Sequence, residues 1–338
     1  MSTNTNLYKA KRAKNDEFYT QFTDVSKELL HYKLHFKDKI VFCNCDDPTW
    51  SAFWKYFHLN FEALGLKKLI STHYDKNKPT YKMEYIGGND NDIEFGVKIP
   101  LEGNGDFRNQ ECIDLLDEAD IVVTNPPFSL VREYLACLVE HGKKFLIVGD
   151  MNWITYKEVF PLLKSNSIWL GNCSVKEFVQ PDGTIKKFGN KLWFTNLDIA
   201  KRHEKLILWK HYSSEEYPTY DNYDAINVDK VDQIPCDYDG VMGVPITYLD
   251  KHNPDQFEIL GYTGGLGWNE QNDVQTTKEY VDAKQHNPDG SITSGGKVNT
   301  GAALRYDSIP ADRYYSASNV NGYLLRTYGR ILIRRKDA

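Results

Sequence analysis

Long apolar runs are missing from this chain. No stretch approaches the roughly 20 apolar residues that a membrane helix needs, and residues 1–14 are polar and basic. Charged residues make up 26% and hydrophobic residues 41% of the 338 residues, which is an ordinary globular composition. We therefore expect a cytoplasmic protein with neither a membrane span nor a secretory leader.

Cysteine is scarce and poorly spaced for metal binding. The six cysteines include no Cys-x-x-Cys pair, and Cys43 and Cys45 have no second pair nearby. Structural zinc sites and disulfide frameworks usually draw on paired cysteines. We expect reduced thiols in or near the core, no disulfide framework and no metal site.

The chain also lacks a glycine-rich phosphate loop. The first predicted strand, which starts at residue 39, ends in Cys-Asn-Cys-Asp-Asp-Pro instead of a Gly-x-Gly-x-x-Gly turn. A pyrophosphate ligand needs backbone N–H groups that such a turn exposes. A nucleotide with a pyrophosphate is therefore disfavoured, whereas a nucleoside cofactor without phosphate is tolerated.

An excess of positive charge is missing as well. The net charge is −6, which argues mildly against nonspecific binding of polyanions. Lysine and arginine nevertheless cluster in residues 9–14, 186–191 and 326–336. Each cluster suits either a local nucleic-acid surface or a solvated tail or edge strand.

The residues that are present predict an α/β fold. Short β-branched runs predict buried parallel strands, and helical apolar spacing separates them. A strand, helix, strand order of this length is a βαβ unit with a right-handed crossover. The predicted helices cover 24–32, 50–64, 109–116, 130–140 and 156–163, and the predicted strands cover 39–47, 68–75, 121–123, 144–149, 168–171 and 191–197.

Two regions depart from this alternation. Residues 76–101 contain two alternating segments around a turn-rich stretch, so we expect a β-hairpin insertion there. From about residue 205, aromatic residues, Asp, Asn and Pro dominate and helical periodicity fades. We expect a first domain over 1–204 and a loop-rich, partly β region over 205–338 that packs on it.

Four residues at the end of the 121–123 strand have a specific chemistry. Asn125, Pro126, Pro127 and Phe128 form a stiff turn that offers two carbonyl acceptors and an aromatic face. The acceptors would take both protons of an exocyclic amine and leave its lone pair free to attack an electrophile. A strand-ending turn with a core phenylalanine explains the same residues. The tetrapeptide resembles the catalytic motif of amino-methyltransferases that use S-adenosylmethionine.

Acids follow the predicted strands before Asn125. Asp46 or Asp47, Asp75 and Asp106 each lie at or just past a strand end, and parallel strands present these ends along one edge of a sheet. Carboxylates there can accept hydrogen bonds from an ammonium group, from two ribose hydroxyls and from an adenine amine. S-adenosylmethionine carries all three groups. The choice between Asp46 and Asp47 stays open.

Seven segments that run through most of the chain in one order resemble the EcoRI-type adenine-specific DNA methyltransferase family. The first loop, which lacks glycine, is itself a feature of that family. The weakest match is residues 262–320, which look like a lineage-specific insertion. The seven segments are residues 18–21, 43–48, 105–108, 119–129, 154–159, 220–227 and 240–247.

The resemblance implies a Rossmann-like methyltransferase sheet, mostly parallel, with helices on both faces and a target-recognition region over 205–338. It implies methyl transfer from S-adenosylmethionine, without a metal, to the N6 amine of a flipped adenine in duplex DNA, by a monomer. Asn125, Pro126, Pro127 and Phe128 would hold the adenine. The cofactor would lie against Phe18, Tyr19, Thr20, Asn44, Asp46, Asp47, Asp75, Asp106 and Phe107.

Two alternative functions stay open at this point. The same tetrapeptide serves any planar amine or amide, so the substrate could be RNA or a protein glutamine. A non-catalytic DNA-binding or anti-restriction protein could also retain such a fold. An intact Asn-Pro-Pro-Phe turn together with the strand-end acids argues against the second alternative.

Overall fold

The computed structural model describes residues 19–76, 79–179, 183–264 and 269–336. The chain forms two compact units. One comprises the described residues up to Trp153 together with Ile168–Ala200, and the other comprises Ile154–Ser167 with the described residues from Lys201 onward. Among the described helices, none is long and apolar enough to cross a membrane.

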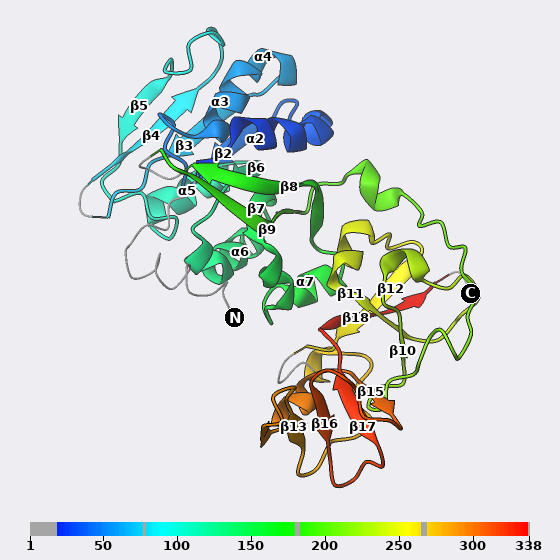
Figure 1. Cartoon of the computed structure of the whole chain (residues 1–338). Helices are drawn as coiled ribbons and strands as arrows, with labels where there is room; N and C mark the ends of the chain where they lie inside the picture. The colour runs from blue at the N-terminus through cyan, green and yellow to red at the C-terminus, as the bar shows by residue number, and fades with distance from the viewer. Residues whose placement is uncertain (1–18, 77–78, 180–182, 265–268, 337–338) are drawn as a thin grey trace. The chain divides into compact units, whose positions relative to one another are not determined.

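The first unit is a mixed α/β structure around a nine-stranded sheet (Figure 1). Its four central strands pair in parallel, as expected, and antiparallel strands extend it on both sides. In spatial order the strands are β1 (Tyr19–Thr20), β8 (Trp169–Val179), β9 (Ile185–Thr195), β7 (Lys144–Asp150), β6 (Ile121–Thr124), β2 (Ile40–Cys43), β3 (Lys68–Thr72), β4 (Tyr81–Tyr85) and β5 (Val97–Pro100).

The order of the central strands determines where the helices lie. The chain moves from β2 outward to β3, then crosses back past β2 to β6 and β7. Right-handed crossovers in opposite directions place their helices on opposite faces of a sheet. Figure 1 accordingly shows α3 and α5 on opposite sides of the strands. The helices of this unit are α2 (Phe22–Leu29), α3 (Ala52–Leu59), α4 (Phe61–Leu64), α5 (Gln110–Glu118) and α6 (Val131–Glu140).

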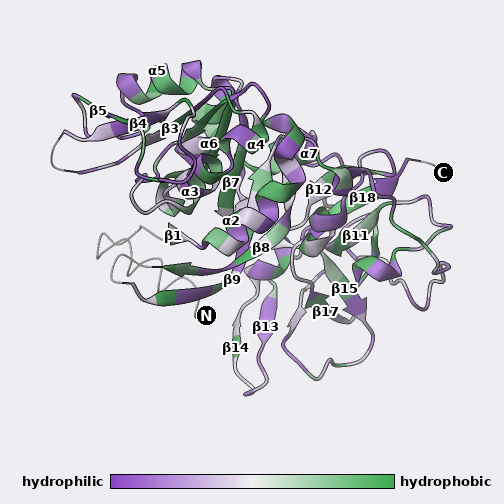
Figure 2. Cartoon of the chain, turned by 90° about the horizontal axis from the view of Figure 1, so that it is seen from above, coloured by the Kyte–Doolittle hydropathy of each residue, from purple (hydrophilic) through white to green (hydrophobic). Residues whose placement is uncertain are grey.

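Local sequence explains how these helices begin, end and pack. Ser51 caps α3, because its Oγ accepts hydrogen bonds from the N–H groups of Phe53 and Trp54 at 3.1 and 3.2 Å. Gly65 ends α4 in the left-handed conformation with φ of 64°, which glycine adopts without a steric penalty. Figure 2 shows hydrophobic residues on the strands around β7 and both hydrophobic and hydrophilic residues on the surrounding helices, as expected for helices with one buried face.

Residues 76–101 extend the sheet at its β3 edge. β4 pairs antiparallel with β3, and β5 pairs antiparallel with β4. The strand β5 starts at Val97, whereas its alternating pattern starts at residue 93. Three of its four residues are exposed, and β5 is the outermost strand on this side of the sheet.

The described residues of the second unit form two sheets. A four-stranded sheet consists of β10 (Ile226–Asn227), β11 (Met242–Pro245), β18 (Arg330–Arg335) and β12 (Phe257–Tyr262). A five-stranded antiparallel sheet consists of β14 (Ile292–Ser294), β13 (Lys284–His286), β16 (Tyr314–Ser316), β17 (Tyr323–Arg326) and β15 (Ala303–Tyr306). The second sheet has its own apolar cluster, which includes Tyr280, Val298 and Leu324.

The segment 154–167 packs within the second unit although it lies between strands of the first. Its helix α7 (Phe160–Lys164) is shorter than the predicted 156–163 helix and begins later. Lys164 forms an ion pair of 2.6 Å with Asp273, and the ring of Phe160 lies 5.8 Å from that of Tyr262. A helical pattern predicts the helix, but it carries no information on which unit the helix packs against.

Candidate active site

The candidate site lies at the carboxyl ends of β2 and β6. The chain reverses its direction of travel across the sheet between these neighbouring strands, and such switch points are where open α/β sheets bind ligands. The loop after β2 carries Asn44, Asp46 and Asp47, and the turn after β6 starts with Asn125. The structure therefore brings together two of the predicted groups of site residues.

Hydroxyl groups from neighbouring strands hold the loop after β2. Thr72 Oγ1 on β3 donates to Asn44 Oδ1 at 3.0 Å. Ser71 Oγ donates to the backbone carbonyl of Asp46, and Thr124 Oγ1 on β6 donates to the backbone carbonyl of Asn44. Cys45 has a positive φ of 65°, which is uncommon outside glycine. These hydrogen bonds explain how a loop without glycine is held in this conformation.

Asp46 connects this loop to the Asn-Pro-Pro-Phe turn. Its side chain is buried, and Oδ2 lies 2.5 Å from Thr124 Oγ1 and 3.4 Å from the backbone nitrogen of Asn125. Burial raises the pKa of Asp46 to about 7, although these hydrogen bonds oppose the rise. Thr124 has one hydroxyl proton for two acceptors, so a neutral Asp46 can donate to Thr124 while Thr124 donates to Asn44.

Asp47 has a different set of partners. Its Oδ1 accepts hydrogen bonds from Thr49 Oγ1 at 2.7 Å, from the Thr49 backbone at 2.9 Å and from the Tyr81 hydroxyl at 2.9 Å. Its Oδ2 lies 3.5 Å from His73 Nε2. These contacts direct Asp47 toward β3 and β4, whereas Asp46 faces β6. Asp46 and Asp47 are adjacent in the sequence, but their side chains have different hydrogen-bond partners in the structure.

Asp75 and Asp106 are brought near one another by backbone pairing. The N–H of Asp75 donates to the carbonyl of Asn104 at 2.9 Å, which places residues 104–106 beside the end of β3. The Asp106 carboxylate accepts from Arg108 Nε at 2.9 Å and Nη2 at 2.7 Å, and this pairing lowers its pKa. Phe107, a predicted cofactor residue, is buried, and its ring lies 5.0 Å from that of Tyr134.

Gly105 allows this close approach, and we expect Gly105→Ala to disrupt it. Gly105 has φ of +76°, and a Cβ atom there would lie 2.1 Å from the carbonyl oxygen of His73. A left-handed alanine alone costs about 1–3 kcal/mol of strain. Because the clash adds to this strain, we expect Gly105→Ala to lower the free energy of unfolding by more than that amount. Gly142→Ala is the matched control: φ is +60° but nothing lies within 4 Å. Equal losses in chemical denaturation would contradict the close approach.

The Phe128 ring packs among aromatic side chains behind the turn. It contacts Trp153 and Phe178 with edge-to-face geometry at centroid distances of 6.1 and 6.2 Å. Lys191 Nζ lies over the ring, 4.5 Å from its centroid. The Phe128 ring is buried, as expected if Phe128 is a core residue. Phe128 also follows the Asn-Pro-Pro segment directly, which is the position from which its ring would stack on a substrate base.

A buried ion pair lies beside Phe128, and sequence reasoning missed it. Lys191 Nζ on β9 is 2.5 Å from Asp150 Oδ2 on β7, and both side chains are buried. Asn190 Nδ2 and the N–H of Asn152 also donate to the Asp150 carboxylate. The sequence contains Lys191 only as one member of a basic cluster. The available signal was that Lys191 directly precedes the apolar residues Leu192, Trp193 and Phe194.

The N-terminal aromatic segment is only partly described. Phe18 lies outside the described residues, and of Tyr19 the structure describes the backbone pairing alone. Thr20 is buried and pairs in register with Phe178 of β8, whose ring contacts Phe128. The segment 19–20 therefore lies one strand away from the aromatic surroundings of the turn.

The class of protein follows from these features. A mixed α/β sheet with strand-end acids beside an Asn-Pro-Pro-Phe turn is consistent with an amino-methyltransferase. The chain belongs to the family of EcoRI-type adenine-specific methyltransferases, because the family model "Adenine-specific methyltransferase EcoRI" matches residues 6–336. It is therefore an adenine-specific methyltransferase.

Similar proteins agree with this assignment. The Type II methyltransferase M.EcoRI of Escherichia coli is 50% identical over 297 residues, which cover 78% of this chain and 91% of the relative. The Type II methyltransferase M.MpnI of Mycoplasma pneumoniae is 41% identical over 273 residues, which cover 75% of this chain and 84% of the relative. No solved structure gives a significant match to the chain.

Proposed function

We propose that this enzyme transfers a methyl group from S-adenosylmethionine to the exocyclic N6 amine of an adenine in a short duplex DNA sequence, after that base is flipped out of the duplex. One observation carries the proposal. Asp46 is hydrogen-bonded to Thr124 and to the backbone of Asn125, so an acid suited to the cofactor lies directly against the first residue of the turn suited to the adenine. Flipping costs a few kcal/mol, which stacking and pocket hydrogen bonds offset.

The residues at the sheet edge fit S-adenosylmethionine, which when bound supplies an electrophilic methyl group. We assign Asp46 to the cofactor ammonium group, because Asp46 lies against the first residue of the turn, whereas Asp47 faces Tyr81 and His73. Asp75, after β3, suits the ribose hydroxyls. Asp106 suits the adenine amine of the cofactor, since a carboxylate that accepts from Arg108 keeps further lone pairs.

The turn after β6 would orient the target amine. The side-chain oxygen of Asn125 and the carbonyl of Pro126 accept the two N6 protons and keep the nitrogen lone pair directed at the methyl group. Phe128 provides an aromatic face for the base. The amine loses its proton only after it has become cationic, so no strong general base is required. Orientation and electrostatic stabilisation then supply most of the catalysis.

Cofactor affinity is expected to depend on the protonation of Asp46. The pKa of about 7 means that free enzyme below pH 7 holds Asp46 mostly neutral. An ammonium group requires the carboxylate, so the apparent affinity for S-adenosylmethionine should fall about tenfold for each pH unit below 7. Isothermal titration calorimetry between pH 5 and pH 7 measures this slope.

Two variants distinguish the adjacent acids in that experiment. Asp46→Asn should bind more weakly and lose the slope, whereas Asp47→Asn should keep it. An unchanged slope in Asp46→Asn would transfer the assignment to another group.

Sequence recognition is proposed to lie in residues 205–338. Exposed aromatic side chains there, including Trp209 and Tyr328, could stack on or wedge between bases, and Arg305 and Arg313 could reach base edges or phosphates. Each good bidentate contact to a base contributes about 1–3 kcal/mol of discrimination. We further propose that the enzyme acts in the cytoplasm as a monomer, which light scattering of the free and DNA-bound protein would test.

Single-molecule sequencing of genomic DNA from cells that express the protein tests the whole proposal. N6-methyladenine in one fixed sequence context is the expected result, with cells that express Asn125→Ala as the matched control. No modified context, together with intact cofactor binding, would overturn duplex DNA as the substrate. Methyltransferase assays of a lysate of the same cells, with RNA and with protein as substrates, would then identify which alternative substrate is methylated.

A further inference from the structure

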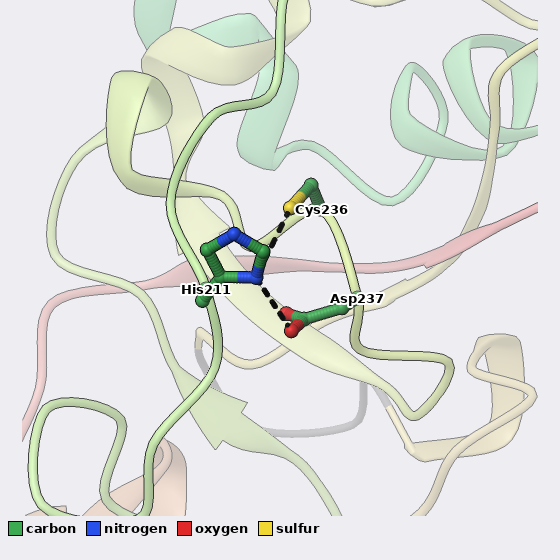
Figure 3. Close-up of side chains that lie close together, drawn as sticks. All are labelled: His211, Cys236 and Asp237. Carbon is green, nitrogen blue, oxygen red and sulfur yellow. Dashed lines mark hydrogen bonds and ion pairs between the residues drawn. The ribbon is translucent and has the colours of Figure 1, made fainter.

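Three side chains of mixed chemistry converge on the surface of the second unit (Figure 3). His211 Nδ1 lies 2.9 Å from Asp237 Oδ2 and 3.8 Å from Cys236 Sγ. The candidate ligand atoms of all three residues lie within 4.8 Å of one another. No other group of three such residues occurs in the part of the chain that the structure describes.

Backbone contacts hold these side chains together from two separate segments. Lys210 and Pro235 form a parallel β-bridge, and the N–H of Cys236 donates to the carbonyl of Lys210 at 2.8 Å. The N–H of Tyr212 donates to Asp237 Oδ1 at 2.8 Å, which leaves Oδ2 directed at His211. An outer hydrogen bond that orients a ligating carboxylate is a regular feature of metal sites.

The spacing and chemistry of the three groups suit zinc. With bonds of about 2.0–2.3 Å to nitrogen, oxygen and sulfur, the ligand atoms of a tetrahedral zinc ion lie roughly 3.3–3.8 Å apart. The separations of 2.9 and 3.8 Å around His211 Nδ1 need only small side-chain rotations to reach that range. A thiolate and an imidazole favour zinc over magnesium or calcium, which prefer oxygen ligands.

We propose that His211, Cys236 and Asp237 form a zinc site with three protein ligands and an open fourth position. The side chains of His211 and Asp237 are 79% and 47% exposed, so an ion can enter and water can complete the tetrahedron. The simpler alternative is a surface ion pair between His211 and Asp237 with an uninvolved thiol beside it. That alternative requires no metal.

A bound ion would cross-link two irregular segments. Residues 204–225 and 228–241 contain little regular structure. A cross-link between these segments reduces the conformational entropy that they gain on unfolding. The ligands are 25 residues apart, so neither a Cys-x-x-Cys nor a His-x-x-x-His spacing marks them in the sequence. The parallel bridge between Lys210 and Pro235 creates the site.

Cobalt substitution in the full chain, purified without a polyhistidine tag, tests the proposal. The chelator-treated protein should bind one equivalent of cobalt with a thiolate-to-cobalt charge-transfer absorption, which zinc but not excess magnesium removes. Cys236→Ser should abolish the absorption, and His211→Ala should weaken cobalt binding at least about tenfold, the smallest loss usual even for an outer partner. Cys137→Ser is the control, because Cys137 is also partly exposed but belongs to no such group.

Two results would overturn the zinc site. One is the absence of a thiolate absorption in the parent chain, which would leave the surface ion pair as the explanation. The other is an equal absorption in Cys236→Ser. Thermal melting without metal should give the same midpoint for the parent chain and for His211→Ala and Cys236→Ser, so a loss of cobalt binding would not arise from unfolding.

Discussion

Asn125→Ala is expected to lower the turnover number for DNA methylation by about 10²–10³-fold, the usual loss when one preorganised hydrogen-bonding group is removed from a reacting centre. The side-chain oxygen of Asn125 is proposed to accept a proton of the target amine, and alanine offers no acceptor. Cofactor affinity should be unchanged, because Asp46 bonds to the backbone of Asn125 rather than to its side chain. Single-turnover kinetics and calorimetry measure these two quantities separately.

The control for this substitution is Asn91→Ala. Asn91 is exposed in the turn between β4 and β5, so its loss should leave turnover within about twofold of the parent enzyme if the site is where we propose. Retained turnover in Asn125→Ala would remove the catalytic role from this residue. A parallel loss of cofactor binding would instead indicate that the β2 loop had been displaced.

Lys191→Met is expected to lower the free energy of unfolding by about 3–5 kcal/mol, because it leaves the Asp150 carboxylate buried without its cation. The two charges are 2.5 Å apart, and neither side chain is accessible to solvent that could replace the lost partner. Asn190 and the N–H of Asn152 still donate to Asp150, but they carry no charge. Equilibrium denaturation in urea measures the loss.

Two further variants make this expectation specific. Asp150→Asn combined with Lys191→Met should recover much of the stability, since it removes the unpaired charge rather than the pair. Lys187→Met, on the same strand, should cost less than about 1 kcal/mol, because the Lys187 side chain is 81% exposed in its ion pair with Glu177. A loss below about 1 kcal/mol for Lys191→Met alone would contradict a stabilising role for this buried ion pair.

Strands whose sequence is continuously apolar were predictable, because burial on both faces is their dominant physical requirement. The run 121–123 corresponds to β6, and the run 144–149 to β7. Boundaries were less predictable where pairing partners decide them. The predicted strand 168–171 extends to Val179, because β9 pairs with β8 along most of its length. The sequence of residues 172–179 does not by itself indicate that these residues pair with β9.

The candidate site was predictable to the level of residue types at strand ends. Acids after β2 and β3 and the turn after β6 follow from the α/β alternation, since parallel strands end at one edge. The distinction between Asp46 and Asp47 was not predictable, because it depends on which neighbour each carboxylate meets. Thr124 on β6 meets Asp46, and Tyr81 on β4 meets Asp47.

The sequence by itself determined the membership of this protein in an adenine-specific methyltransferase family and the order of its α/β elements, because local patterns and short motifs carry that information. Tertiary structure alone decided the contacts between residues distant in the chain. Asp46 and Thr124, Asp150 and Lys191, and His211 and Cys236 become neighbours only through strand pairing. Burial and partners set the charge state of a side chain, so its chemistry is decided only when the chain has folded.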